Sequence, residues 1–199
     1  PGGGWAAGEG GAGDGMNPIS WLVLALLVVG TALILWWRWT RRVTRGLARV
    51  TAAWGELEKA LAERATALEA MHAELEQAGY VPEGRPRLRE AVAKLRQATG
   101  PRDLAAADRA VEDVLLQIYR GLPRERIEAI RQAQDRLAQA DEERDLARRS
   151  YNDLALSWAF LVHRFPYRQI ARHRRLVPPE PFLLPGEEAD WARRHLDRP

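Results

Sequence analysis

The stretch ISWLVLALLVVGTALILWW, residues Ile19–Trp37, contains no charged side chain and decides how the rest of the chain is arranged. As a helix that rises about 1.5 Å per residue it spans roughly 30 Å, which matches the hydrocarbon thickness of a bilayer. The sequence therefore predicts one transmembrane helix over residues 18–40.

The residues on either side of this stretch predict its orientation. Residues 1–18 contain two acids, Glu9 and Asp14, and no Lys or Arg. Five arginines follow the stretch before the next acid, Glu56: Arg38, Arg41, Arg42, Arg45 and Arg49. Because basic flanks stay in the cytoplasm, we expect the amino terminus outside and residues 38–199 inside. A cleaved signal peptide is the alternative, and it is disfavoured because the basic residues follow the apolar run instead of preceding it.

The composition limits the classes of function. All 30 basic residues follow the apolar stretch, together with all but two of the 27 acids, so the inner part is mildly basic. This charge suits a position beside an anionic leaflet and is too weak to predict nucleic-acid binding. The chain has no cysteine, which excludes disulfides and thiolate metal sites. We expect no cofactor and no bound metal, and a disordered Gly-rich tail over 1–17, in which Met16 is a candidate start.

Beyond the stretch, apolar residues recur every three or four positions, as on one face of a helix. The first run is Val50, Trp54, Leu57, Leu61, Ala65, Leu68, Met71 and Leu75. It predicts a helix that continues from the membrane to about Gly79. Shorter runs predict helices over 88–95 and 104–118, and a long one from about Pro123 to Phe165, all separated by Gly and Pro. The predicted fold is all-α: one transmembrane helix, an antiparallel three- to four-helix bundle over 41–176, and a Pro-rich tail with a short helix over 177–199.

Charged residues interrupt the apolar faces of these helices. Asp141, Arg144 and Arg148 fall on the inward face of the last helix, and Arg64 lies beside the seam of the first. An unpaired buried ion costs several kcal/mol, about 3–5 when its partner is removed. We therefore expect Asp141 to pair with Arg64 or Arg148. The alternative is that these side chains reach water at the edge of the seam.

One constellation in the last third of the chain is specific enough to indicate a family. It comprises Asp141, Arg148, Tyr151, Asn152, Phe165, Pro166, Ile170, Ala171, Leu176 and Phe182, with Trp54 and Arg64 upstream. This set resembles the carboxy-terminal signature of the LemA family of bacterial membrane-anchored proteins. Ala159 stands where that family has a second Asn, and Leu176 replaces a typical Phe, so the chain resembles a divergent member. The resemblance implies a membrane helix joined to a helical bundle, and it implies no catalytic activity, cofactor or substrate.

The signature residues also have a physical interpretation. Tyr151, Leu154, Trp158 and Phe165 share one helical face, so we expect them in the core. Asn152 lies on another face and either bonds a neighbouring element or faces solvent. Pro166 cannot donate a backbone hydrogen bond, so the helix should kink or end near Phe165.

A basic segment follows the long helix. His163–Arg175 contains no acid and five arginines: Arg164, Arg168, Arg172, Arg174 and Arg175. One interpretation is a solvated helix end whose cations complement the helix dipole. The other is a contact surface for lipid headgroups or for an acidic protein.

Nothing in the sequence indicates catalysis. The four histidines, His72, His163, His173 and His195, lack metal-ligand spacing, and no phosphate-binding Gly-rich loop is present. We therefore expect a non-catalytic scaffold at the bacterial inner membrane that binds another membrane-associated protein, with oligomeric state and small-molecule ligand left open. The alternative is a lipid-engaging, membrane-remodelling module that uses His163–Arg175. A cofactor-free enzyme is a remote third hypothesis.

Overall fold

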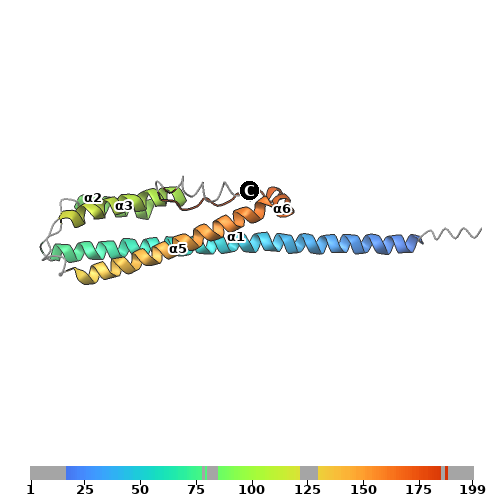
Figure 1. Ribbon diagram of the computed structural model, residues 1–199, viewed down its shortest axis with the longest axis horizontal. Helices are drawn as coiled ribbons and strands as arrows, with labels where there is room; N and C mark the ends of the chain where they lie inside the picture. The colour runs from blue at the N-terminus through green and yellow to red at the C-terminus, as the bar shows by residue number, and fades with distance from the viewer. Residues whose placement is uncertain (1–16, 78, 80–84, 122–129, 185–186, 188–199) are drawn as a thin grey trace, which may run out of the picture.

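A computed structural model describes residues 17–77, 79, 85–121, 130–184 and 187, which form five helices and no strand (Figure 1). The helices are α1 Pro18–Gln77, α2 Arg85–Gln97, α3 Pro101–Gly121, α5 Arg131–His163 and α6 Tyr167–His173. The all-α prediction is confirmed for these residues. The tail predicted to be disordered and the short helix expected near the carboxyl end lie outside them, apart from Asn17, Glu187 and the segment up to Leu184.

α1 is a single uninterrupted helix of 60 residues. It begins where sequence rules place a start, because Pro18 occupies the first helical position and the Asn17 carbonyl accepts hydrogen bonds from the amides of Ser20 and Trp21. It ends just before Gly79, whose positive φ of 72° is the left-handed conformation that commonly terminates helices. The predicted end near Gly79 is confirmed.

The two halves of α1 have different surroundings. Up to Arg42 none of its side chains is buried, and large apolar residues such as Ile19 and Leu26 are 70% and 72% exposed. This half is long enough and apolar enough to cross a membrane. From Val43 onward the helix buries one stripe of side chains, and Figure 1 shows the first half projecting alone beyond the other helices.

α5 packs along the second half of α1 in the opposite direction. Arg64 meets Asp141 partway along this half of α1, and Trp158 meets Val43 at its beginning. Each step toward the start of α1 is matched by a step toward the end of α5, so the two helices are antiparallel. Their shared seam is the most extensive contact between helices in the described structure.

α2 and α3 pack on each other and extend the same hydrophobic core. α2 buries Leu88, Val92 and Leu95, as the periodicity predicts. Gly100, with φ 85°, and Pro101 then turn the chain into α3. Tyr119 of α3 donates a hydrogen bond to the sulfur of Met71 on α1 at 3.3 Å, so α3 also contacts the long helix.

The end of α5 agrees with one prediction and contradicts another. The helix stops at His163, as expected from Pro166, and Arg164 is extended with ψ 145°. The prediction that Phe165 lies in the core is wrong, because its side chain is 78% exposed. Helical spacing no longer applies once the helix has ended. The predicted start of this helix near Pro123 lies outside the described residues.

Candidate functional site

A buried cluster of charges joins α1, α3 and α5. Its centre is Arg64, which has no solvent exposure. The Arg64 guanidinium donates from Nε to Asp141 Oδ1 at 2.5 Å, from Nη1 to Asp108 Oδ1 at 2.5 Å, and from Nη2 to Glu112 Oε2 at 3.0 Å. Each of its three nitrogens therefore has a carboxylate partner, which offsets the cost of burying the charge.

A second arginine completes the cluster. Arg144 of α5 is 8% exposed and donates from Nη1 to Asp108 Oδ2 at 3.0 Å and from Nη2 to Asp145 Oδ1 at 3.0 Å. Asp108 is thus held between two guanidinium groups and is only 1% exposed. Burial raises the pKa of Asp108 above its usual value, against the attraction of Arg64 and Arg144. For Arg144, burial lowers the pKa, but the surrounding carboxylates, Asp108 first, raise it on balance.

The predicted ion pair is confirmed with one of its two candidate partners. Asp141 pairs with Arg64, so Arg64 lies inside the seam and not at its edge. Arg148 instead donates to Glu187 Oε2 at 2.7 Å. Asp141 itself stays 37% exposed, so it closes the cluster on the solvent side.

Sequence reasoning missed Asp108 and Glu112. The predicted apolar face of α3 includes Leu104, Val111 and Leu115 but no charged residue. Asp108 nevertheless lies four residues after Leu104 and three before Val111, on the same face. The rule that singled out Asp141 would have found it.

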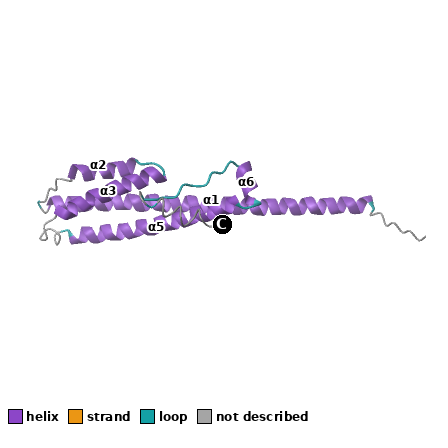
Figure 2. Ribbon diagram, turned by 45° about the horizontal axis from the view of Figure 1, so that its top comes forward, coloured by secondary structure: helices purple, strands orange, loops and turns teal. Residues whose placement is uncertain are grey.

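Tyr151 and Asn152 hold the segment that follows α6. The segment 176–184, called here the C-terminal strap, runs back along α5 (Figure 2). Asn152 binds the backbone of Phe182 twice, donating from Nδ2 to its carbonyl at 2.9 Å and accepting at Oδ1 from its amide at 2.8 Å. Tyr151 donates its hydroxyl to the Glu180 carbonyl at 2.6 Å. Burial, with a smaller contribution from the Glu180 charge, raises the pKa of Tyr151.

Most of the remaining signature residues lie around this strap. Phe182 is fully buried, Ala171 is 6% exposed, and the Trp54 ring is 5.1 Å from the Tyr151 ring. Arg148 reaches Glu187 just beyond the strap. The exception is Phe165, which points into solvent beside Pro166. The signature residues therefore form two groups: one belongs to the buried ion cluster, and the other holds the strap in place.

The α1–α5 seam is tightly packed where Trp158 meets α1. Trp158 is 2% exposed and donates its indole N–H to the Val43 carbonyl at 3.0 Å. A Cβ placed on Gly46 would lie 2.7 Å from Trp158 Cδ1. Gly46 is thus the residue that lets the indole reach the backbone of α1.

The five arginines of His163–Arg175 are exposed and carry no ion pair within the described part of the chain. α6 occupies the middle of this segment, so its cations surround a short helix end. Both interpretations of the segment remain compatible with this placement.

The charged residues of the buried cluster pair with one another. Every carboxylate of the cluster accepts from an arginine, so the cluster joins three helices. Across the described ranges, no group of three or more His, Asp or Glu side chains is arranged to hold a metal ion.

Comparison with known proteins adds no family. No protein-family model matches the chain, and no curated protein matches it. Fold and site together define a class: a helical protein with one candidate membrane-spanning helix whose packed half is joined by buried ion pairs.

Proposed function

We propose that this chain is a non-catalytic, single-pass membrane protein that acts as a cytoplasm-facing helical scaffold for another protein at the bacterial inner membrane. The observation that carries the proposal is the division of α1 into an apolar exposed half and a packed half within one helix. Exposed apolar surface of this extent requires lipid or a partner to cover it.

The charge around α1 supports the proposed orientation. Arginines follow the apolar half at once, whereas none precedes it. Trp21 near one end and Trp36, Trp37 and Trp39 at the other suit the two headgroup layers. We therefore assign α2, α3, α5 and α6 to the cytoplasm.

We further propose that α1, α2, α3 and α5 form one antiparallel bundle of the LemA type. Three observations support this: a single core, the antiparallel α1–α5 seam, and the grouping of signature residues around Arg64 and the strap. Membership of the LemA family rests on those residues, with Ala159 and Leu176 as departures.

Crosslinking in native membranes tests the scaffold role. Because the chain has no cysteine, a single Cys introduced at exposed Leu116 or Leu146 would be the sole crosslinking thiol, so each crosslink would identify a protein bound near that position. We expect mass spectrometry to identify a recurrent membrane-associated protein at one of these faces. Recovery of the chain only as an uncrosslinked monomer from both positions would contradict the proposal.

The alternative is a membrane-remodelling module that uses His163–Arg175. The arginines of this segment favour it, because they are exposed and form no ion pair among the residues that the structure describes. Reconstitution of the full chain into anionic vesicles, with Arg168, Arg172 and Arg175 changed together to Gln, would discriminate. Vesicle deformation by the unchanged protein that is lost in the triple variant would favour remodelling over scaffolding.

A further inference from the structure

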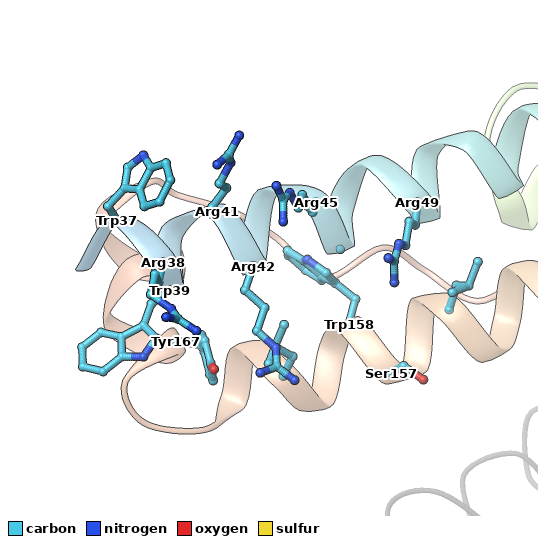
Figure 3. A pocket seen from close by; sticks show the side chains of 13 residues that line it. Trp37, Arg38, Trp39, Arg41, Arg42, Arg45, Arg49, Ser157, Trp158 and Tyr167 are labelled. Carbon is cyan, nitrogen blue, oxygen red and sulfur yellow. The ribbon is translucent and has the colours of Figure 1, made fainter. Parts of the chain in front are cut away.

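A hollow lies where the apolar half of α1 ends. It has a volume of about 800 Å³ and is formed by α1, α5 and α6 (Figure 3). We call it the arginine pocket, after the five α1 side chains that line it: Arg38, Arg41, Arg42, Arg45 and Arg49. Its volume falls in the range of about 300–1,000 Å³ typical of ligand sites.

The pocket concentrates positive charge without neutralising it. All five arginines are exposed, and within the described ranges none forms an ion pair with a carboxylate. No acid lies on α1 before Glu56. This is the opposite of the buried cluster, where each arginine has carboxylate partners. Guanidinium groups left unpaired in a hollow fit planar, bidentate recognition of an external anion such as phosphate.

Aromatic side chains fix part of this charge in position. The Arg41 guanidinium lies 4.6 Å from the centre of the Trp37 ring, and that of Arg42 lies 5.9 Å from the Tyr167 ring of α6. Such cation–π contacts hold an arginine in place while leaving its N–H groups free to donate. Figure 3 shows Arg42 and Arg49 extending from α1 toward α5 on either side of Trp158.

The inner wall of the pocket is apolar, and the indole N–H of Trp158 already has a hydrogen-bond partner. The Trp158 indole uses its N–H on the Val43 carbonyl, so it presents ring atoms to the hollow. Leu154 and Leu161 add apolar surface, and exposed Ser157 adds one hydroxyl. A site with an apolar wall and a cationic rim fits an amphiphile better than a free ion.

The position of the pocket identifies the source of that amphiphile. Trp37 is both the last residue of the uncharged stretch and a lining residue, so the pocket opens where the bilayer would end. From Arg38 to Arg49 the arginines extend about 16 Å along the helix at 1.5 Å per residue, farther than one phosphate reaches. Basic pockets at this depth on the cytoplasmic side bind anionic headgroups.

We propose that the arginine pocket is a binding site for an anionic phospholipid headgroup, with preference for a lipid that carries two phosphates. The inference rests on the proposed membrane location. The bound lipid would join α1 to the ends of α5 and α6 at the membrane surface.

Native mass spectrometry of the full chain, released from nanodiscs of stated composition, tests the site. We expect retention of cardiolipin above phosphatidylglycerol, and none of phosphatidylcholine. Changing Arg42, Arg45 and Arg49 together to Gln should weaken retention by about tenfold or more. The charge-matched control changes Arg87, Arg120 and Arg149, which are exposed and outside the pocket, and should retain lipid as before.

A variant that keeps all charges separates the pocket from general attraction. Ser157→Trp should fill the hollow and reduce retention, whereas Ser150→Trp, on exposed α5 surface outside it, should not. Circular dichroism would establish that both variants keep their helical content. Equal retention in Ser157→Trp and Ser150→Trp would overturn the proposal.

Two further arms separate the remaining explanations. Displacement of the lipid by millimolar inorganic phosphate would overturn the assignment to a lipid. An equal loss in the Arg168, Arg172 and Arg174 triple variant would overturn the assignment to this pocket. Membrane fractionation distinguishes the two proposals. If the protein is integral to the membrane but retains no lipid, only the lipid-binding proposal is contradicted. If the protein is soluble, the proposed membrane function is contradicted as well.

Discussion

At the scale of single residues, Arg64 is the side chain on which the buried cluster depends. Its three nitrogens each bind a different carboxylate, two from α3 and one from α5. Removing it leaves Asp108 buried with Arg144 as its remaining cationic partner. Stability is therefore far more sensitive here than at exposed ion pairs, which contribute about 0–1 kcal/mol.

Arg64→Met should lower the free energy of unfolding by about 3–5 kcal/mol, since it removes one of the two arginine partners of the buried Asp108 carboxylate. The matched control is Arg136→Met, which breaks the pair between exposed Arg136 of α5 and half-buried Glu74 of α1 and should cost about 1 kcal/mol or less. Denaturation of the full chain in detergent, followed by circular dichroism, measures both. Equal losses in the two variants would contradict a structural role for the cluster.

Gly46→Ala should destabilise the seam, because a Cβ there meets Trp158 Cδ1 at 2.7 Å and the indole must shift from the Val43 carbonyl. Gly55→Ala, on the same helix with nothing within 4 Å, should instead stabilise by up to about 1 kcal/mol. The two changes should thus move the melting temperature in opposite directions. If both substitutions shift the melting temperature in the same direction, helix propensity outweighs the contact with Trp158 at Gly46.

Periodicity predicted part of the ion cluster. Asp141 interrupts an apolar stripe and so was expected to find a partner, and the structure supplies Arg64. Asp108 obeys the same rule on α3 but was overlooked. Which arginine would pair with Asp141 could not be predicted, because the choice between Arg64 and Arg148 depends on how α1 and α5 align along their seam.

At the scale of elements, the C-terminal strap is held by few but specific contacts. It has no helix or strand of its own, so its position depends on Asn152, Tyr151 and the buried ring of Phe182. The amide of Asn152 pairs with Phe182 as another backbone strand would.

Asn152→Ala should release the strap, since it removes two hydrogen bonds and leaves the Phe182 backbone unpaired, at about 1–3 kcal/mol. Hydrogen exchange at the Phe182 amide should accelerate by about tenfold or more, because each 1.4 kcal/mol corresponds to one factor of ten. Asp153→Ala, at an exposed neighbouring position, provides the control. Unchanged exchange in Asn152→Ala would show that Phe182 alone anchors the strap.

Helix boundaries could be predicted because local signals set them. Gly79, Gly100 and Pro166 each terminate an element through their own backbone chemistry, and the structure follows them. The position of the strap could not be predicted, since its partners lie about thirty residues away in sequence and bind backbone groups. Phe165 was misplaced because the helical period was extended beyond the end of the helix.

At the scale of the whole molecule, α1 joins the exposed apolar half to the packed half without a break. A continuous helix transmits tilt and rotation between its ends, so a bound lipid or protein at one half would affect the orientation of the other. The arginine pocket lies at the boundary of the two halves, where such an effect would begin.

The central claim is that the apolar half of α1 spans a bilayer with the arginines toward the cytoplasm. The absence of cysteine allows single-Cys labelling of intact cells with a membrane-impermeant maleimide. Asn17→Cys should react from outside, Asp153→Cys only after permeabilisation, and Leu26→Cys only after denaturation. Labelling of Asp153→Cys in intact cells, or ready labelling of Leu26→Cys in the folded protein, would contradict the account.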